Sequence, residues 1–264
     1  MEAKHQVTTA QDRRESIAKM LEERESLTVS ELIARFKVTD TSIRHDLTVL
    51  EQAGKLQRVR GGAITPTSAR SVSSFAALAR QNAQEKRRIG RVAADLVRPG
   101  DVVLLDSGST VAEVAVQMPG ALRGPHAITI VSHSLPVIDE VGSWPQPHLI
   151  CLGGLFLPDR QASVGPMTLA DLRELSADIA FIGCDGLTVE GGLTTPHMLI
   201  AEVGAAMAAR ARRVVVVADA SKLGTAGFTP IVGLDAVHAL VTDDRADPAF
   251  LAELRRCGLE VVVV

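Results

Sequence analysis

Residues 28–54 read TVSELIARFKVTDTSIRHDLTVLEQAG, and this stretch decides the architecture of the N-terminal part of the chain. Its first four residues have the form of a capping box, in which the Thr28 hydroxyl accepts from the Glu31 amide and the Glu31 carboxylate reaches back. An apolar stripe at helical spacing follows, made of Leu32, Ile33 and Phe36. After the short turn 37–39 a second helix is predicted to run to Ala53, with Gly54 as the residue that ends it.

The segments before and after this stretch are predicted to add a helix and a hairpin. A helix is predicted before it, over about residues 11–24, and a short basic β-hairpin after it, over residues 55–64 with its tip at 61–62. A helix, a tight turn, a second helix and a basic hairpin place the second helix in the major groove of DNA. The predicted DNA-binding residues are Thr41, Ser42, Arg44, His45, Arg58 and Arg60. Periodicity alone leaves two other possibilities open: a three-helix packing unit with solvated charges, or a module that binds protein.

The charge distribution fits DNA binding by a small part of the chain. The 264 residues have a formal net charge of −3, which by itself argues against nucleic acid. Residues 1–70, however, contain 12 Lys and Arg against 10 Asp and Glu, whereas residues 71–264 contain 16 against 21. A basic module on a larger, mildly acidic body is therefore predicted.

The rest of the chain alternates between strands and helices. A linker is predicted over residues 67–74, which are rich in Ser, Thr and Ala, and one long helix over about residues 75–97. Seven apolar runs of strand length follow, at 102–106, 127–132, 148–152, 178–183, 213–219, 237–242 and 259–264. Helical segments fall between most of them, so the fold class is α/β, with a mainly parallel sheet covered on both faces.

Polar residues collect where these strands end. The sequence DSGST, residues 106–110, directly follows the first strand and opens a helix, which is a natural phosphate site. Asp185 and Lys222 follow the fourth and fifth strands, where they could accept from sugar hydroxyls and neutralise a phosphate. Taken singly, each of these residues is better explained by a turn, a cap or a solvated charge. Their collection at one sheet edge favours a pocket.

The longer motifs resemble the DeoR family of transcription regulators. Residues 32–54, followed by Arg58-Val59-Arg60-Gly61-Gly62-Ala63, resemble the DeoR-type winged helix-turn-helix, and the order of the strand-end motifs resembles the family's effector domain. The resemblance covers about residues 11–264 and implies a C-terminal domain similar in fold to ribose-5-phosphate isomerase. It implies that a phosphorylated sugar is held by Asp106, Ser107, Gly108, Ser109, Thr110, Asp185, Gly186, Glu202 and Lys222.

The chain departs from the family pattern at a few positions. Thr39 and Ser42 stand where Ser and Thr are usual, and both changes keep a hydroxyl. His45 stands where a second Arg is usual, which removes a permanent charge from the recognition helix. Ser132-His133 stands where Thr-Asn is frequent, which leaves the ligand contact at that position open. A lone histidine at a strand end is more often structural than ligand-binding.

The remaining features exclude several classes. The three cysteines are far apart and form no CxxC motif, so no metal site is predicted and reduced thiols in a cytoplasmic protein are expected. The sequence shows no membrane span, no signal peptide and no cofactor motif. After Asp185-Gly186 the chain continues without the second carboxylate that sugar-phosphate isomerisation would use, so no catalytic residue is predicted.

These observations predict a DNA-binding transcription regulator that is not an enzyme. The predicted domains are a winged helix-turn-helix over residues 11–66, with the helix-turn-helix at about 28–53, and an effector-binding domain over 75–264. The expected partners are double-stranded operator DNA, a phosphorylated sugar or polyol, and further copies of the chain in a homodimer or homotetramer. Repression of a sugar or polyol catabolic operon, relieved by the effector, is the expected function. The alternatives are an isomerase-like enzyme with an accessory N-terminal module, and an adaptor whose N-terminal helices bind protein.

Overall fold

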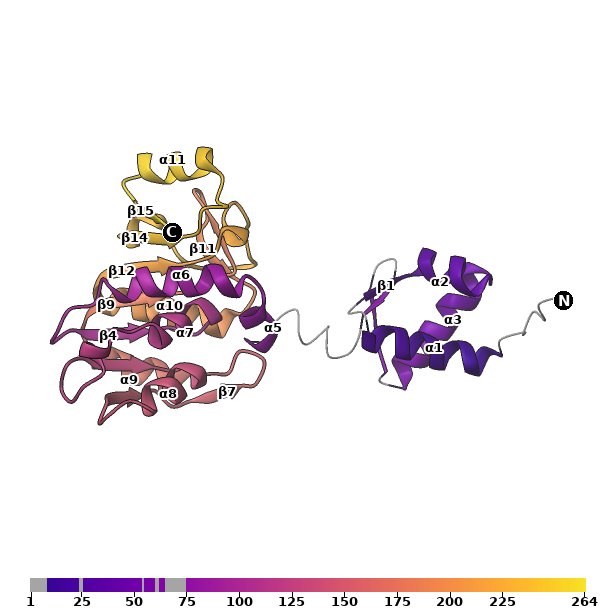
Figure 1. Cartoon of the computed structure of the whole chain (residues 1–264), viewed down its shortest axis with the longest axis horizontal. Helices are drawn as coiled ribbons and strands as arrows, with labels where there is room; N and C mark the ends of the chain where they lie inside the picture. The colour runs from indigo at the N-terminus through magenta and orange to yellow at the C-terminus, as the bar shows by residue number, and fades with distance from the viewer. Residues whose placement is uncertain (1–8, 24–25, 54, 60–61, 65–74) are drawn as a thin grey trace. The chain divides into compact units, whose positions relative to one another are not determined.

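The computed structural model describes residues 9–23, 26–53, 55–59, 62–64 and 75–264. Contacts divide the chain into two compact units, Met1–Ser74 and Phe75–Val264, called here the DNA-binding unit and the sensor unit. Figure 1 shows the helices and strands of each unit, which are described separately below. None of the described helices is both long and apolar enough to cross a membrane.

The DNA-binding unit is a helix-turn-helix with a small antiparallel sheet. Its elements are α1 (Ala10–Glu23), β1 (Ser26–Thr28), α2 (Val29–Phe36), α3 (Asp40–Gln52), β2 (Gln57–Val59) and β3 (Gly62–Ile64). The capping box at the start of α2 is confirmed, because the Thr28 amide donates to the Glu31 carboxylate at 2.8 Å and the Glu31 amide to the Thr28 hydroxyl at 3.2 Å. The three helices enclose a core that includes Ile17, Leu32 and Ile43.

A charged side chain also joins these helices. Asp46 of α3 is 1% exposed and accepts from Arg13 at 2.5 Å and from Arg14 at 2.9 Å, both on α1. Removing one member of a buried ion pair leaves the other charge without compensation, so this contact fixes α1 against α3. The apolar pattern from which the helices were predicted does not indicate this contact between Asp46 and the two arginines.

The sheet of this unit differs from the predicted hairpin in one respect. Strands β2 and β3 pair as predicted, but β1 adds a third strand in the order β1-β3-β2. Gly62 makes this approach possible, since a Cβ at that position would lie 2.3 Å from the Leu27 carbonyl oxygen. Gly62 therefore belongs to β3 and not to the hairpin tip, while Gly54 and Gly61 lie outside the described residues.

The sensor unit is built on a seven-stranded parallel sheet. Its order is β15-β14-β12-β9-β4-β5-β6, and every neighbouring pair is parallel. The strands are β4 (Val102–Leu105), β5 (Thr129–Ser132), β6 (His148–Cys151), β9 (Ala177–Ile182), β12 (Ala211–Val217), β14 (Ala239–Thr242) and β15 (Glu260–Val263). All seven coincide with predicted strands, so the α/β fold class is confirmed.

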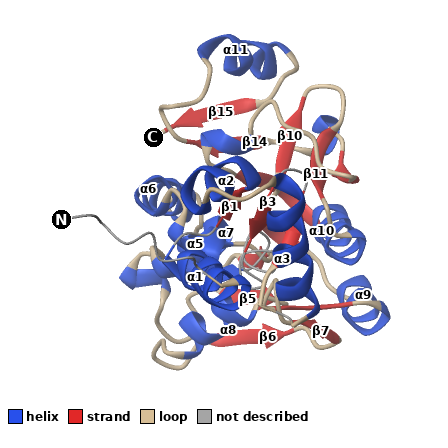
Figure 2. Ribbon diagram, turned by 90° about the vertical axis from the view of Figure 1, so that its right-hand side faces the viewer, coloured by secondary structure: helices blue, strands red, loops and turns tan. Residues whose placement is uncertain are grey.

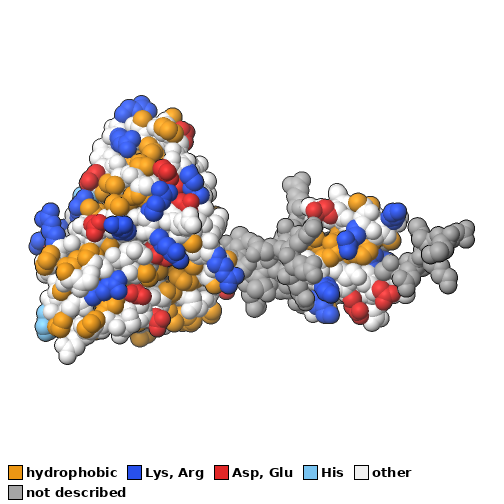
Figure 3. Space-filling view, in the orientation of Figure 1, with side chains coloured by type: hydrophobic (Ala, Val, Ile, Leu, Met, Phe, Trp, Pro, Cys, Tyr) orange, Lys and Arg blue, Asp and Glu red, His pale blue; other side chains and the backbone are white. Residues whose placement is uncertain are grey.

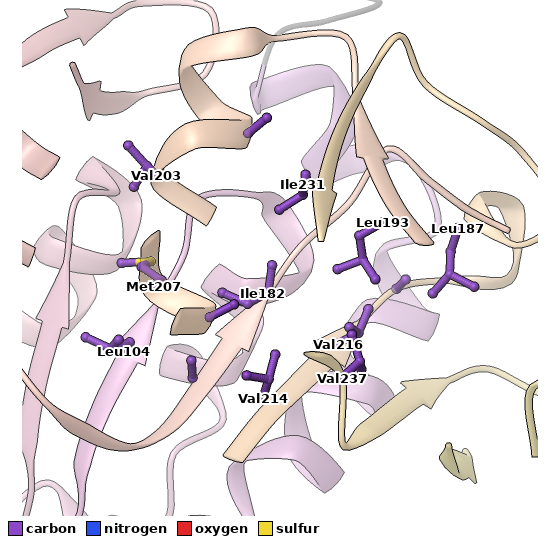
Figure 4. Close-up of a cluster of buried hydrophobic side chains, with 14 of the residues drawn as sticks. Leu104, Ile182, Leu187, Leu193, Val203, Met207, Val214, Val216, Ile231 and Val237 are labelled. Atoms are coloured by element: carbon purple, nitrogen blue, oxygen red, sulfur yellow. The ribbon is translucent and has the colours of Figure 1, made fainter. Parts of the chain in front are cut away.

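Helices cover both faces of this sheet, as Figure 2 shows with α6, α7 and α8 on one side and α9 and α10 on the other. The first face carries α5 (Phe75–Arg80), α6 (Ala83–Ala94), α7 (Ser109–Val116) and α8 (Leu135–Gly142). The second carries α9 (Pro166–Arg173) and α10 (Met198–Arg210), and α11 (Pro248–Arg256) packs with the same core. Figure 4 shows part of that core, in which Met207 of α10 lies near Leu104 of the sheet.

Two small antiparallel elements were not predicted. One is a sheet of β10 (Gly186–Thr188), β11 (Gly192–Thr195) and β13 (Thr229–Val232), and the other is a hairpin of β7 (Leu155–Leu157) and β8 (Ala162–Val164). Most of these strands have three residues, too few for a period-two pattern to stand out. Short 3₁₀ helices follow α7, β12 and β13, at Gly120–Leu122, Ala220–Lys222 and Leu234–Ala236.

The single long helix predicted over residues 75–97 is wrong. The chain forms α5 and α6 instead, because Asn82 between them adopts a left-handed conformation with φ 53°. Asparagine tolerates this region better than most residues. Its side chain donates to Asp219 at 2.8 Å and accepts from Arg245 at 3.1 Å, so contacts from distant parts of the chain stabilise the break.

Candidate DNA-binding surface and effector pocket

The predicted recognition helix presents most of its predicted residues to solvent. Thr41, Arg44 and His45 are exposed on α3. Ser42 is partly committed to the helix start, since its amide donates to the Thr39 hydroxyl and the two side-chain oxygens are 2.9 Å apart. In this state the Arg44 guanidinium pairs with Asp40 one turn earlier, and that hydrogen bond raises the pKa of Arg44. Arg44 must exchange this partner for a base edge to read DNA.

Two of the predicted DNA-binding residues are arginines of the hairpin. Arg58 lies on β2, whose backbone pairs with β3. Arg60 lies outside the described residues. Their contribution to DNA contact therefore stays a prediction from the sequence.

A pocket opens at the carboxyl ends of the sensor sheet strands. It is lined by the loop after β4, the loop after β9, the 3₁₀ helix after β12 and two side chains of α5. The space within it, including the part open to solvent, is about 620 Å³. Figure 3 shows that Lys and Arg side chains on the viewed face of this unit are interspersed with acidic and apolar ones.

The DSGST loop forms one wall of this pocket. Gly108 precedes α7 with φ 122° and ψ 151°, a conformation that side-chain-bearing residues rarely adopt. Ser109 and Thr110 form the first turn of α7 and are each 8% exposed. The backbone N–H groups of a first helical turn have no partner within the helix and meet the positive end of its dipole. This wall is thus rich in donors for an anion.

A buried histidine anchors the loop from behind. His133 is 0% exposed, and its Nδ1 lies 2.7 Å from the Ser163 carbonyl oxygen, which can only accept, so Nδ1 carries a hydrogen. Its Nε2 lies 3.1 Å from the Ser107 amide nitrogen and 3.0 Å from Asp106 Oδ1. The other oxygen of Asp106 accepts from the Gly183 amide at 3.2 Å. Nε2 can either accept from the Ser107 amide or donate to Asp106, but not both at once. Through these contacts His133 joins the phosphate loop to β5 and β8.

Two lysines bring positive charge to the same pocket. Lys86 of α6 is 2% exposed and donates to the Leu78 carbonyl of α5. Burial lowers the pKa of Lys86; the negative charge of Asp219 opposes this effect and the positive charge of Lys222 adds to it. Lys222 is half-buried at the end of its 3₁₀ helix, and its amine makes no hydrogen bond or ion pair with the described residues. An anion between these lysines would relieve their mutual repulsion.

The opposite wall holds an arginine that the sequence did not single out. Arg160, in the turn between β7 and β8, places Nη1 3.4 Å from Asp185 Oδ1 and Nη2 3.4 Å from Asp185 Oδ2. Thr195 of β11 donates to the same carboxylate at 2.7 Å. No sequence signal could have found Arg160, because its strands are too short to predict and its neighbours carry no motif.

The structure sorts the predicted effector residues into two groups. The pocket lining includes Asp106, Ser107, Gly108, Ser109, Thr110, Asp185 and Lys222, and the sequence reasoning missed Lys86, Arg160, Thr195, Phe75 and Leu78. Gly186 does not line the pocket; it starts β10, where a Cβ would lie 2.4 Å from the Thr225 carbonyl oxygen. Glu202 is exposed on α10 and does not line the pocket either. Among the described residues, no cluster of His, Cys, Asp or Glu is arranged to hold a metal ion.

The fold and these two sites define a class: a DNA-binding regulator with a ligand-sensing domain. Two family models match the chain, the DeoR-like helix-turn-helix domain over residues 13–69 and the DeoR C-terminal sensor domain over residues 81–244. The chain belongs to the DeoR family of transcription regulators. The predicted family and the predicted regulatory class are confirmed.

Individual relatives span almost the whole chain. It is 29% identical to the transcriptional repressor GlcR of Bacillus subtilis, over 96% of this chain and 96% of GlcR. It is 30% identical to the putative aga operon repressor of Escherichia coli O157:H7, over 98% and 95%. These relatives are named as transcription regulators and not as enzymes, which sets aside the isomerase alternative. A ribose 5-phosphate isomerase from Methanocaldococcus jannaschii shares 21% identity at a TM-score of 0.40, over 54% of this chain and 55% of that chain.

Proposed function

We propose that this regulator represses a sugar or polyol catabolic operon and leaves its operator when a phosphorylated sugar or polyol binds the sensor pocket. The observation that carries the proposal is the wall formed by the DSGST loop and Lys222, which combines helix-terminal amides, two hydroxyl side chains and an amine with no partner among the described residues. These are the groups that bind a phosphate. The names of the relatives, which include a repressor of an aga operon, support control of sugar use.

The operator would be read by α3 of two or four copies of the chain. In the proposed complex Thr41, Ser42, Arg44 and His45 face base edges and phosphates in the major groove, and Arg58 and Arg60 of the hairpin reach the backbone or minor groove. A homodimer or homotetramer places two such helices on one face of DNA. Half-sites are then expected about 10 base pairs apart, or at a multiple of that spacing.

The pocket also offers a path by which ligand binding reaches the rest of the protein. Phe75 and Leu78 of α5 line the pocket, and α5 begins directly after the segment 65–74 that leads from the DNA-binding unit. The Lys86 amine holds the Leu78 carbonyl from the other side. A ligand that draws Lys86 toward its phosphate would weaken this contact and move α5. To lower operator affinity a hundredfold, the ligand must prefer the released state by about 2.7 kcal/mol.

The testing experiment measures DNA binding at fixed salt. Full-length protein is titrated onto the intergenic DNA upstream of its own gene, followed by fluorescence anisotropy, and a panel of sugar and polyol phosphates is then added. A specific complex that one phosphate dissolves is the expected result. A protein that forms no salt-dependent complex with any DNA tested would contradict the proposal and favour the protein-binding alternative.

Two variants separate the roles of the units. Arg44→Ala should weaken operator binding by about 1–3 kcal/mol and relax base preference. Lys222→Gln should leave operator binding intact and abolish release by the phosphate. Arg212→Gln is the matched control for Lys222→Gln, since it removes one positive charge from a side chain that is 85% exposed. Loss of DNA binding in Lys222→Gln alone would contradict the division of labour.

A further inference from the structure

The pocket lining holds two groups of charged side chains. The first comprises Lys222 and the buried Lys86, with Asp219 and Asp106 as nearby acids, beside the N-terminal amides of α7. The second is the ion pair of Arg160 and Asp185. The first group offers an anion helix-terminal amides and the Lys222 amine, whereas in the second group each charge already has its counter-charge.

The geometry of the Arg160–Asp185 pair leaves hydrogen-bonding capacity for a ligand. Both of its N–O distances are 3.4 Å, longer than the 2.7–2.9 Å typical of a well-formed charged hydrogen bond. Arg160 is 11% exposed in its side chain, and its Nε is buried without a partner in the described protein. A buried guanidinium N–H without an acceptor is costly, so this group is set up to donate to a bound molecule.

Three described residues near the pair are neutral or acidic. Thr195 donates to Asp185 and is neutral, and Asp159 beside Arg160 is acidic. His197 faces the pair, and burial together with the charge of Arg160 lowers its pKa, while Asp185 and Asp159 oppose the shift. His197 is thus uncharged at neutral pH.

We propose that Arg160 and Asp185 select the end of the ligand remote from its phosphate, and that they accept a neutral, hydroxyl-bearing end and reject a carboxylate or a second phosphate. A hydroxyl group is both donor and acceptor, so adjacent hydroxyls satisfy Arg160 Nε and the Asp185 carboxylate together. A second anion would accept from Arg160 but would lie against Asp185, and like charges held together cost several kcal/mol. The proposal rests on the proposed function and narrows its ligand to sugar or polyol monophosphates.

The test compares matched ligands on full-length protein by isothermal titration calorimetry. Each probe set contains a sugar or polyol monophosphate of four, five or six carbons, the phosphoaldonate of the same length, and the bisphosphate where one exists. Wild-type protein should bind at least one monophosphate at least about tenfold more tightly than its phosphoaldonate and its bisphosphate.

Two variants should change the ratio of monophosphate affinity to phosphoaldonate affinity in opposite directions. Asp185→Asn leaves Arg160 without its counter-charge, so the preference should shrink at least about tenfold as the phosphoaldonate binds better. Arg160→Gln leaves Asp185 unopposed, so monophosphate affinity should fall and the preference should grow. A merely structural role would weaken both ligands alike. Asp171→Asn, on the exposed surface of α9, is the matched control.

The outcomes separate this proposal from the proposed function. A wild-type protein that binds a phosphoaldonate or a bisphosphate as tightly as the monophosphate overturns the selectivity, while ligand sensing stands. Variants that both shift the ratio in one direction, or leave it unchanged although they melt like wild type, also overturn it. A wild-type protein that binds no sugar or polyol phosphate of any kind overturns the proposed function itself.

Discussion

Replacing His133 should strongly destabilise the sensor unit, because its side chain is a hydrogen-bond partner of several buried polar groups. The imidazole is fully buried and contacts three polar groups, the Ser163 carbonyl, the Ser107 amide and the Asp106 carboxylate. In His133→Ala all three lose this partner. His133→Asn introduces the residue that is frequent at this position in the family, and its shorter amide can reach one or two of the three groups but not all.

The expected loss of stability follows from the number of buried polar groups that lose a hydrogen bond. A buried polar group left without a partner costs about 1–3 kcal/mol, and water entering the new cavity reduces this toward the lower value. Because Nε2 serves either the Ser107 amide or the Asp106 carboxylate, two hydrogen bonds are lost, which costs about 2–4 kcal/mol in His133→Ala and about 1–3 kcal/mol in His133→Asn. For a unit of this size, the first value corresponds to a fall in melting temperature of about 4–16 °C.

The chain provides a built-in probe for this measurement. Trp144 is its only tryptophan, there is no tyrosine, and Trp144 lies in the sensor unit with 6% exposure. Thermal unfolding followed by tryptophan fluorescence therefore reports on the sensor unit alone. A fall of less than about 2 °C in His133→Ala would refute the anchoring role, as would an Asn variant as unstable as the Ala variant.

Three further predictions concern the same unit. Gly108→Ala should weaken sugar-phosphate binding at least about tenfold in titration calorimetry, because its φ of 122° strains any side chain, while DNA binding persists. Cys184 should resist a thiol reagent at about pH 8 while Cys151 and Cys257 react, since burial raises its pKa to about 12; equal reactivity in the native protein would contradict this. Burial alone would raise the pKa of Asp243, but hydrogen bonds from Arg245 and two amides outweigh burial, so this pKa lies below its usual value. Asp243 thus stabilises the fold above its unfolded pKa and loses this effect as pH falls through its folded value. Asp243→Asn should therefore destabilise at neutral pH, and its difference from wild type in denaturant titrations should shrink as pH falls below about 4.

The parts of the fold that the sequence predicted are those set by local patterns. The capping box at Thr28 and Glu31 needs only residues three apart, and it forms as predicted. The five inner strands of the parallel sheet are mostly buried, so each contains a continuous apolar run that stands out in the sequence. The strand-end residues of the pocket were predictable for the same reason, because parallel strands bring their carboxyl ends to one edge.

The parts that could not be predicted depend on distant contacts. The break at Asn82 is stabilised by Asp219 and Arg245, which lie more than a hundred residues away in sequence, while the local pattern favours an unbroken helix. Arg160 enters the pocket from a hairpin of two three-residue strands, which leave no periodic signal. Glu202 was predicted to contact the effector, but it is exposed on α10 and does not line the pocket.

The arrangement of the pocket carboxylates explains how such a site can bind a sugar phosphate without turning it over. Proton transfer at a sugar carbon requires a general base whose lone pair faces the substrate. Asp106 accepts from the Gly183 amide with one oxygen, and its other oxygen lies 3.0 Å from His133 Nε2. Asp185 accepts from Thr195 and is paired with Arg160. The side chains that hold the phosphate loop and the ligand end in place therefore also withhold the carboxylates from chemistry, which suits a sensor that must release its ligand unchanged.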